Sequence, residues 1–560
     1  MDWKKGFALT LALTIVCSSM PVSAFAAGRD SADDTNEYEL YPAPHEISYA
    51  DEVTELPDSV NAVFEDGIDD YTIQRAEDAL DAAGISMQQI EADEVTAEAV
   101  EVKSIPVTAL EEAHSTAPAA DEIDASDAEA VSDTSDAHDT DTSDSTESTV
   151  DAAPADVLSE SPAEENTTSE ATTEMLELTA AHETAVDAEK TDVPSDKDER
   201  EESAKAENSD AQLYVGIYDQ SEANKDADSV VDQWFVSIFG DNADEFDVFE
   251  KTDSYLLVVK NGKIGVLGKD TDSAFYGLTT LKQIMTQIKH KTVRDLAVQD
   301  WADVASRGFI EGYYGNPWST EDRAELMRWG GEFKLNSYFY APKDDPKHNG
   351  KWWELYTPEE LEQKIAPLAK AGNESKCQFV FALHPFMSNA ITTETYDAKV
   401  KMLKEKFEQV MGAGVRQIAI LADDAGNQGS ELYIKLMRDL VDWVSSDEMQ
   451  QKYPGLKTTI PFCPEEYGRW GESWMSQLPE EVPVVMTGGK IWGEVTNDFT
   501  NSFSSNVGRG PYMWINWPCS DNSKRHLIMG GYANFLHPGV NPEKIQGIVL
   551  NPMQQSEPSK

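Results

Sequence analysis

The pattern of hydrophobic positions changes near residue 301. Beyond that point, short apolar runs rich in β-branched and aromatic residues alternate with amphipathic segments of helical spacing. The runs are RGFIEGYY from Arg307, LNSYFYA from Leu335, CQFVFAL from Cys377, RQIAILA from Arg416, LKTTIPF from Leu456, VPVVMTG from Val482, PYMWINW from Pro511 and QGIVLN from Gln546. Eight strand–helix repeats in about 250 residues predict a (β/α)8 TIM barrel, of the α/β class, over residues 301–560. An open doubly wound sheet is the alternative, but no glycine-rich phosphate loop follows any run, which disfavours its nucleotide-binding form.

Two segments before the barrel, residues 38–90 and 211–300, also have the pattern of folded sequence. The first joins a strand-like start, YELYPAPHEISY, to a helix-like stretch, TIQRAEDALDAAGI. The second contains the strand LYVGIY, a hairpin centred on Asn261-Gly262, and a helix whose apolar residues recur every three or four positions from Phe275. A segment of about 50 residues is marginal alone, so we expect the two segments to form one small α/β domain rather than two independent units.

Residues 91–210 differ from the rest of the chain in composition. They contain 37 acidic and 5 basic residues and no Phe, Trp, Tyr, Gly or Cys, so they carry −32 of the net charge of −60 on the 560-residue chain. Such a segment cannot bury enough apolar surface to offset chain entropy, and we expect a disordered acidic insertion that splits the N-terminal domain. We interpret it as a solvated spacer, with a cation-dependent surface tether as the alternative. The acidic balance argues against nucleic acid and anionic membranes as partners, because both require a basic surface.

The N-terminus, residues 1–26, has the pattern of a secretory signal peptide. Two lysines precede an apolar run and then small residues, with Ala24-Phe25-Ala26 as the expected cleavage site. The apolar run is too short to span a membrane as a mature helix, and no other apolar stretch approaches the length of about 20 residues that a span requires. We therefore expect a secreted protein whose mature chain does not insert into a membrane.

Three cysteines remain after cleavage, too few for a disulfide framework. The sequence also has no metal-ligand spacing and no cofactor motif.

In a barrel enzyme the catalytic side chains come from the C-terminal ends of the strands. Polar or small residues follow all eight runs here: Glu311-Gly312, Lys343, His384, Asp423-Asp424, Glu465-Glu466-Tyr467, Thr487, Asn516 with Asp521, and Asn551. Carboxylates, amides, a lysine and a tyrosine among several tryptophans indicate a carbohydrate site, because sugars need polar contacts to hydroxyls and flat apolar surfaces for ring faces. His384 either lines such a site or is a structural histidine at the barrel rim, and the sequence leaves both interpretations open.

Asp423-Asp424 is the most informative pair at these strand ends. Neighbours within a strand point to opposite faces, but at a strand end the chain turns and both carboxylates can face one pocket. Two carboxylates that close cannot both ionise freely, so the pKa of one is expected to rise, and a protonated carboxyl can donate to a leaving glycosidic oxygen. A solvated turn or a helix N-cap is the alternative explanation of the pair taken alone.

Four motifs, in order along the chain, together resemble glycoside hydrolase family 84. They are RGFIEGYYGNPW (307–318), KLNSYFYAPKDDPKH (334–348), ILADD (420–424) and MWINWPCSD (513–521). The family contains O-GlcNAcases and secreted β-N-acetylglucosaminidases formerly called hyaluronidases. The resemblance extends from about Trp301 to Pro558 and implies a catalytic barrel preceded by a small α/β domain. Because this chain ends where the family's last barrel helix begins, we expect the sequence to be a fragment of a longer protein.

The resemblance further implies retaining hydrolysis of terminal β-N-acetylglucosamine (GlcNAc), in which the substrate's own acetamido oxygen attacks the anomeric carbon and forms an oxazoline. By position, Asp423 would orient the acetamido nitrogen and Asp424 would be the general acid and then the general base. Tyr467 would donate a hydrogen bond near the acetamido oxygen. The other matched positions would bind the sugar or line the acetamido pocket; they are Gly312, Lys343, Thr487, Ile491, Trp514, Asn516, Asp521 and Asn551.

Two other functions are weighed against this one. A GlcNAc-binding adhesin on an inactive barrel would have no use for the Asp423-Asp424 acid/base pair. An endo-acting hyaluronan hydrolase would need an open cleft, whereas Asp521 is expected to close the pocket around the outer hydroxyls of one sugar. The expected partner is therefore a carbohydrate, terminal β-GlcNAc on glycoproteins or glycans.

Overall fold

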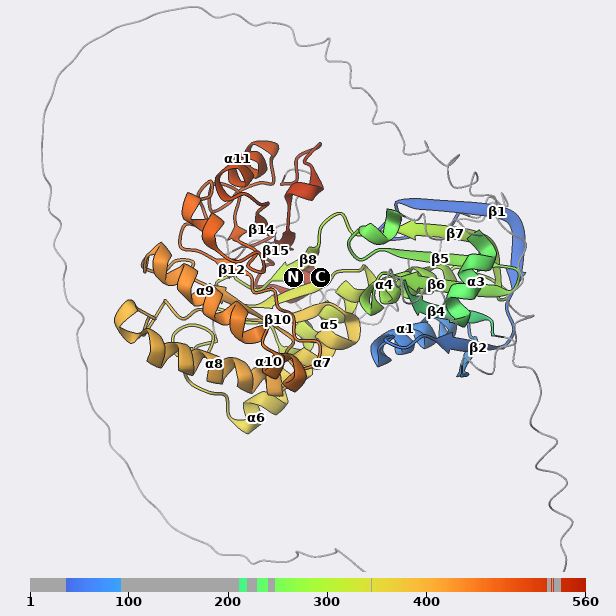
Figure 1. The fold of residues 1–560 in the computed structure, drawn as a ribbon, viewed down its shortest axis with the longest axis horizontal. Coiled ribbons are helices and arrows are strands. Elements are labelled where there is room, and N and C mark those ends of the chain that lie inside the picture. The colour runs from blue at the N-terminus through green and yellow to red at the C-terminus, as the bar shows by residue number, and fades with distance from the viewer. Residues whose placement is uncertain are drawn as a thin grey trace, which may run out of the picture. The chain divides into compact units, whose positions relative to one another are not determined.

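The computed structural model describes residues 37–91, 211–218, 229–239, 247–343, 345–520, 525, 527 and 535–559. The predicted signal peptide lies outside the described residues, as does the predicted acidic insertion apart from its first residue. Within the described ranges, no helix is both long and apolar enough to cross a membrane. The described residues form an N-terminal sheet with helices and a C-terminal barrel (Figure 1).

The N-terminal part forms one seven-stranded sheet with the strand order β1-β7-β5-β6-β4-β2-β3. Its strands are β1 (Glu46–Glu55), β2 (Ser59–Phe64), β3 (Ser86–Gln89), β4 (Leu213–Ile217), β5 (Tyr255–Lys260), β6 (Lys263–Gly268) and β7 (Thr292–Asp300). Strand β2 pairs with β3 on one side and with β4 on the other, so residues from before and after the predicted insertion share this sheet. The predicted hairpin joins β5 to β6, and Asn261 and Gly262 have positive φ angles of 51° and 82°, as a two-residue hairpin turn requires.

Helices pack against both faces of this sheet. They are α1 (Asp70–Asp81), α3 (Val230–Phe239), the 3-10 helix η5 (Asp247–Glu250) and α4 (Thr271–Met285). Successive strand residues point to opposite faces, and both faces are apolar. Leu257 of β5 belongs to the same buried cluster as α1 and α4, whereas its neighbour Val258 belongs to the cluster of Trp234 from α3.

The C-terminal part is a barrel of eight parallel strands in the order β12-β11-β10-β9-β8-β15-β14-β13. They are β8 (Ser306–Ile310), β9 (Ser337–Tyr340), β10 (Gln378–Leu383), β11 (Gln417–Leu421), β12 (Phe462–Cys463), β13 (Val485–Met486), β14 (Tyr512–Ile515) and β15 (Gly547–Leu550). Each predicted run overlaps one of these strands, although β8 begins one residue before its run and β12 ends one residue after its run. The two edges meet where the Phe462 N–H donates to the Pro483 carbonyl at 2.9 Å, beside a parallel bridge from Phe462 to Val484. The predicted (β/α)8 barrel is confirmed.

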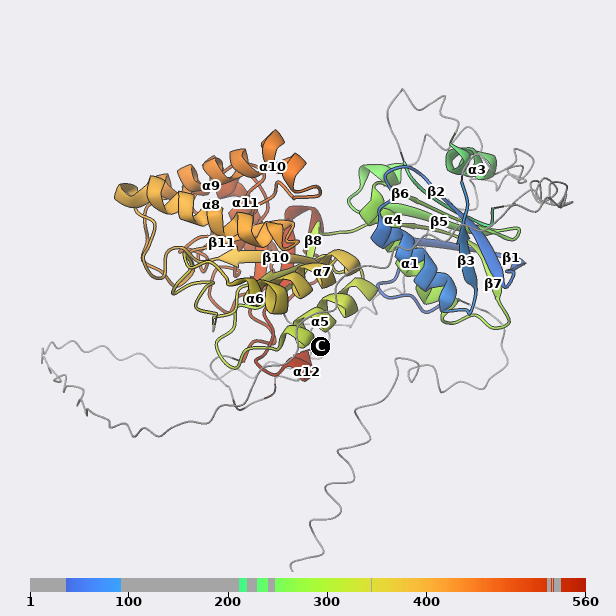
Figure 2. The same ribbon diagram turned by 90° about the horizontal axis from the view of Figure 1, so that it is seen from below.

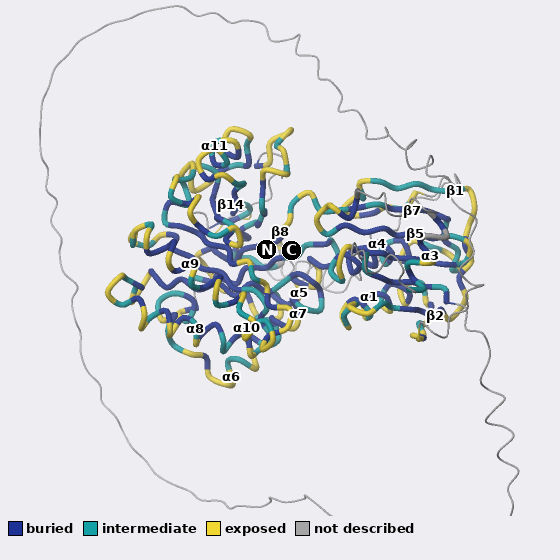
Figure 3. Tube along the Cα trace, viewed as in Figure 1, coloured by how far each residue is buried: buried dark blue, intermediate teal, exposed yellow. Residues whose placement is uncertain are grey.

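Helices surround the strands of the barrel. They are α5 (Thr320–Glu332), α6 (Pro358–Glu360), the π-helix η6 (Leu361–Ile365), α7 (Ala366–Ser375), η7 (Thr393–Thr395), α8 (Tyr396–Gly412), α9 (Ser430–Val444), α10 (Asp447–Lys452), η8 (Ser473–Gln477), α11 (Asn497–Val507), η11 (Pro542–Lys544) and α12 (Ser556–Ser559). Helices α8 and α9 lie side by side (Figure 2), and the Tyr396 hydroxyl donates to Asp439 at 2.7 Å. Side chains such as Val380 fill the barrel interior, while the adjacent Phe381 packs under the helices. The barrel strands are therefore buried on both sides (Figure 3).

The barrel departs from the predicted repeat between β12 and β13. Each of these strands has only two residues, and the 3-10 helix η8 stands between them where a longer helix was expected. Pro461, Pro464 and Pro483 flank the two strands, and proline has no N–H to donate to a sheet ladder. This part of the wall is consequently short, and loops after β12 and β13 carry several polar residues to the mouth of the barrel.

Candidate active site

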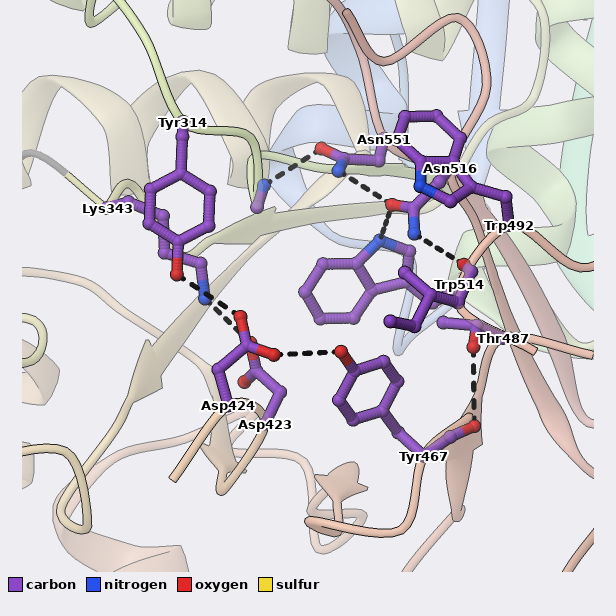
Figure 4. A pocket seen from close by; sticks show the side chains of 12 residues that line it. Tyr314, Lys343, Asp423, Asp424, Tyr467, Thr487, Trp492, Trp514, Asn516 and Asn551 are labelled. Carbon is purple, nitrogen blue, oxygen red and sulfur yellow. Dashed lines mark hydrogen bonds and ion pairs between the residues drawn. The ribbon is translucent and has the colours of Figure 1, made fainter. Parts of the chain in front are cut away.

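A cavity of about 460 Å³ opens at the C-terminal ends of the barrel strands (Figure 4). Its lining residues are Gly312, Tyr314, Lys343, Asp423, Asp424, Tyr467, Thr487, Ile491, Trp492, Trp514, Asn516 and Asn551. The structure thus brings together all the site residues expected from the sequence except Asp521, which lies outside the described residues. Side chains from seven different strand ends converge here, as expected for a barrel enzyme.

The two adjacent carboxylates at the end of β11 have different surroundings. Asp423 is 4% exposed, and its Oδ2 accepts a hydrogen bond from Lys343 Nζ at 2.7 Å. Asp424 is exposed to the cavity, and its φ of +57° places it in the left-handed region, which is uncommon for a residue with a Cβ atom. This turn of the backbone allows both carboxylates to line one cavity, which an extended chain would not.

Asp423 is held in its ionised form. Burial acts to raise the pKa of its carboxyl, but the charge of the Lys343 ammonium and its hydrogen bond to the carboxylate outweigh burial and lower the pKa to about 2. The same pairing raises the pKa of Lys343 against the opposing effect of burial. The increase expected for one carboxyl of the pair is thus not found at Asp423, because Lys343 neutralises its charge at close range.

Two tyrosines donate hydrogen bonds to Asp424. The Tyr467 hydroxyl lies 2.8 Å from Oδ1, and the Tyr314 hydroxyl lies 3.2 Å from Oδ2 (Figure 4). Burial, and then the hydrogen bond to Asp424, raises the pKa of Tyr467. Tyr467 therefore remains a hydrogen-bond donor throughout the neutral pH range.

The opposite wall of the cavity is an amide and indole network. Asn516 Oδ1 accepts hydrogen bonds from Trp514 Nε1 and from Asn551 Nδ2, both at 2.9 Å (Figure 4). Asn516 Nδ2 donates to the Ile491 carbonyl at 2.8 Å, and the Gly312 N–H donates to Asn551 Oδ1 at 3.1 Å. These hydrogen bonds fix the orientation of each amide and of the Trp514 ring. The wall therefore presents one apolar surface, the Trp514 ring, between polar groups. Such a surface suits a sugar carrying an apolar substituent.

Thr487 and Ile491 lie on the loop that follows β13. The Thr487 hydroxyl donates to the Lys490 carbonyl at 2.7 Å, and the Thr487 N–H donates to the Tyr467 carbonyl at 3.0 Å. These bonds tie the loop to the segment that carries Tyr467. Ile491 is 54% exposed and Trp492 is 41% exposed, so this loop also forms an apolar rim at the mouth.

Substitution of Gly312 by alanine is expected to disturb this wall. A Cβ atom at Gly312 would lie 2.2 Å from Cζ2 of Trp514, so the indole would have to move out of the position set by Asn516. We expect a free energy of unfolding lower by about 1–3 kcal/mol, as for other overpacked cores. We also expect isothermal titration calorimetry to show weaker binding of GlcNAc, the sugar expected from the sequence. Gly412→Ala is the matched control, because a Cβ there meets no atom within 4 Å. Wild-type affinity in Gly312→Ala would show that the Trp514 position does not matter for binding.

Two residues that line the cavity were not predicted to belong to it, and the role of a third, His384, was left open. Tyr314 and Trp492 line the cavity from loops whose paths depend on the tertiary fold. Tyr314 lies inside the first family-like motif, and this position could have identified it as a site residue. For Trp492 the sequence offered only its position next to Ile491. His384 contacts the backbone of Asp423 from the end of β10.

The Cys463 thiol beside this site is not set up for catalysis. Cys463 is buried below it, and burial raises the pKa of its thiol well above the usual range, so it is not a ready nucleophile. Across the described ranges, no group of three or more His, Cys, Asp or Glu residues is arranged to hold a metal ion. The titratable groups that line the cavity are carboxylates, tyrosines and one lysine.

A barrel with two carboxylates and a sugar-sized pocket at its strand ends defines the class of a glycoside hydrolase. Residues 307–560 match the family model described as beta-N-acetylglucosaminidase, and residues 37–301 match the model of glycosyl hydrolase family 20, domain 2. The solved structure of CpGH84D superposes with a TM-score of 0.66 at 30% identity, over 94% of this chain and 67% of that one. The chain belongs to glycoside hydrolase family 84.

Further relatives agree with this assignment. CpGH84B shares the fold, with a TM-score of 0.59 at 20% identity over 94% of this chain and 69% of that one. The rat (Rattus norvegicus) and mouse (Mus musculus) proteins named Protein O-GlcNAcase are each 32% identical over 264 residues, 44% of this chain. That match spans 28% of the length of each mammalian protein.

Proposed function

We propose that the chain is a retaining exo-β-N-acetylglucosaminidase that acts through an oxazoline formed by the substrate itself. The proposal rests on the different surroundings of two adjacent carboxylates in one cavity. Asp423 is buried and held ionised by Lys343, whereas Asp424 faces the cavity between two tyrosine hydroxyls. This mechanism needs two groups: an anion that holds part of the substrate, and a neighbouring group that acts as acid and then as base.

In the first step the acetamido oxygen of the bound sugar attacks the anomeric carbon while the bond to the leaving oxygen breaks. Asp424 donates its proton to that oxygen. The acetamido nitrogen becomes positively charged as the oxazoline forms, and the Asp423 carboxylate accepts a hydrogen bond from its N–H. Before the sugar binds, the Tyr467 hydroxyl donates to Asp424; in the complex it turns to donate near the acetamido group and positions that group for attack. The attack is intramolecular because the acetamido group and the anomeric carbon belong to one sugar, and positioning raises its effective concentration.

In the second step the Asp424 carboxylate takes a proton from water. The resulting nucleophile attacks the anomeric carbon, the bond to the oxazoline oxygen breaks, and the acetamido group is restored. Two displacements at one carbon return the product to the β configuration, so the reaction retains stereochemistry.

Specificity for N-acetyl sugars follows from the wall around Trp514. Trp514 is 5% exposed and Thr487 is 1% exposed, so a methyl group placed against them is removed from water.

The name of the mammalian relatives supports GlcNAc linked to protein as the substrate class. Release of single terminal sugars, rather than cleavage within a polymer, follows from the expectation that Asp521 closes the pocket around the outer hydroxyls of one sugar.

The direct test compares aryl β-GlcNAc with aryl β-glucoside and with the aryl 2-trifluoroacetamido analogue. We expect turnover of the first, none of the glucoside, and a strongly reduced kcat/KM for the fluorinated sugar, because fluorine withdraws electrons from the attacking oxygen. Binding of GlcNAc without turnover would instead support an adhesin. Oligosaccharides released from hyaluronan would support an endo-acting enzyme.

We also propose that the protein is secreted. The support is the N-terminal sequence alone, with its basic start, apolar run and Ala24-Phe25-Ala26 site. Mass spectrometry of protein recovered from the culture medium is expected to find a chain that begins at Ala27. A chain retained in the cytoplasm with its first residues intact would contradict secretion.

Replacement of residues 92–210 by a flexible linker is expected to leave catalysis intact. Strand β3 ends at Gln89 and β4 begins at Leu213, on opposite sides of the parallel strand β2, so a crossover of about a dozen residues suffices to join them. Since every cavity-lining residue lies beyond 311, we expect kcat/KM for aryl β-GlcNAc within about twofold of the parent, in keeping with the small cost of changing a loop. A large fall in kcat would refute the spacer interpretation.

A further inference from the structure

His384 contacts the peptide that joins the two catalytic carboxylates. It directly follows β10, is 0% exposed and does not line the cavity. Its Nε2 lies 2.6 Å from the backbone oxygen of Asp423, and its Nδ1 lies 3.2 Å from the backbone nitrogen of Met387. A carbonyl oxygen can only accept and an amide N–H can only donate, so the ring carries its proton on Nε2. Burial also lowers the pKa of His384, in keeping with a neutral ring.

The oxygen that His384 holds belongs to the peptide plane between Asp423 and Asp424. Because the peptide is planar, the orientation of this carbonyl determines the direction in which the chain enters Asp424. Asp424 has a φ of +57°, a left-handed conformation that is uncommon for residues with a Cβ, although Asp adopts it more readily than most, and a constraint from the surroundings stabilises it. The hydrogen bond from His384 is such a constraint. It acts at the bond whose rotation decides whether Asp424 points into the cavity or away from it.

We propose that His384 is a positioning residue for the general acid. Its Nε2–H holds the Asp423–Asp424 peptide so that the Asp424 carboxyl reaches the glycosidic oxygen while Asp423 stays paired with Lys343. The inference rests on the proposed function. His384 itself touches neither the sugar nor the leaving group. It acts through its hydrogen bond to the Asp423 carbonyl oxygen, and the same Nε2 lies 3.6 Å from the Asp423 carboxylate oxygen Oδ1.

Two substitutions separate this role from a general structural one. In His384→Gln the side-chain amide nitrogen extends to the place of Nε2 and can donate to the Asp423 carbonyl. In His384→Asn the shorter side chain reaches only the place of Nδ1, where its oxygen can accept from the Met387 N–H. If the contact with Asp423 matters, glutamine preserves function and asparagine does not; if the contact with Met387 matters, the order is reversed. His290→Gln, at an exposed turn of the N-terminal domain, is the control for histidine replacement as such.

The measurement is kcat/KM for phenyl β-GlcNAc, whose leaving group needs a proton, and for 2,4-dinitrophenyl β-GlcNAc, whose leaving group does not. For His384→Asn we expect a fall of about 100-fold with the phenyl substrate, the scale of loss for a misplaced catalytic group, and a much smaller fall with the dinitrophenyl substrate. For His384→Gln we expect values near those of the wild type with both. Equal losses with the two substrates, or a glutamine variant as impaired as the asparagine variant, would overturn the proposal.

The wild-type enzyme distinguishes this inference from the proposed function. If the wild type turns over neither aryl β-GlcNAc, the proposed function fails. If the wild type is active and the variants show no dependence on the leaving group, only the role of His384 fails. Thermal unfolding is followed for each variant. Should His384→Asn not fold, His384→Met fills the same space without a donor and is expected to show the same selective loss.

Discussion

Replacement of Asp424 by asparagine is expected to lower kcat/KM for phenyl β-GlcNAc by about a thousandfold, within the range typical of a lost general acid. Asparagine accepts the hydrogen bonds from Tyr467 and Tyr314 through one atom only and has no proton to give to the leaving oxygen. The loss should be much smaller for 2,4-dinitrophenyl β-GlcNAc, which leaves without protonation. With that substrate kcat itself still falls, because Asp424 also activates the water that opens the oxazoline.

Asp397→Asn serves as the matched control, since Asp397 is an exposed residue in the first turn of α8. It should have wild-type kinetics with both substrates. An Asp424→Asn enzyme with unchanged kcat/KM, or with equal losses for the two leaving groups, would remove Asp424 from the role of acid.

Replacement of Lys343 by methionine is expected to destabilise the fold as well as to reduce activity. The side chains of Lys343 and Asp423 are each 5% exposed, so the substitution leaves a buried carboxylate without its cation. Breaking a buried pair in this way typically costs about 3–5 kcal/mol of free energy of unfolding near neutral pH. Activity falls too, because the charge and orientation of Asp423 at the acetamido nitrogen depend on this contact.

The pH dependence of this loss has a definite sign. The pKa of Asp423 is lowered from 3.8 to about 2 in the folded protein, so its contribution to stability is fully present above about pH 4 and disappears as the pH falls towards 2. The difference in free energy of unfolding between wild type and Lys343→Met should therefore be largest near neutral pH and shrink below pH 4. Urea unfolding at a series of pH values measures this difference.

Lys435→Met is the control for that experiment. Lys435 is 56% exposed and pairs with Asp439 on the surface of α9, where solvent screens the interaction. It should change the stability little at any pH. A Lys343→Met protein as stable as the control near neutral pH would show that Lys343 does not sustain the charge of Asp423.

Most of the barrel was predictable because each strand has a local signal. A strand buried on both faces must be an apolar run, and eight such runs stand in the sequence. The lengths of β12 and β13 were not predictable from apolarity alone. The prolines beside them remove N–H donors, and only the assembled sheet shows which residues still pair.

The membership of the site was predictable to the extent that its residues end strands or stand in family-like motifs. Its internal contacts were not, because they join residues far apart in sequence. Lys343 was expected to bind the sugar and lines the cavity; its pairing with Asp423, 80 residues away, was not expected from any motif. The left-handed conformation of Asp424 is stabilised by contacts with residues far away in the sequence. The local sequence ILADDAG therefore does not predict it.

Substrate-assisted hydrolysis with retention is tested by the anomer that is first released from aryl β-GlcNAc. Proton NMR resolves the anomeric signals before mutarotation mixes them. We expect β-GlcNAc to appear first and the α anomer to accumulate later at the rate of spontaneous mutarotation. If α-GlcNAc is the first product, a water molecule has attacked directly and the roles given to Asp423 and Asp424 are wrong.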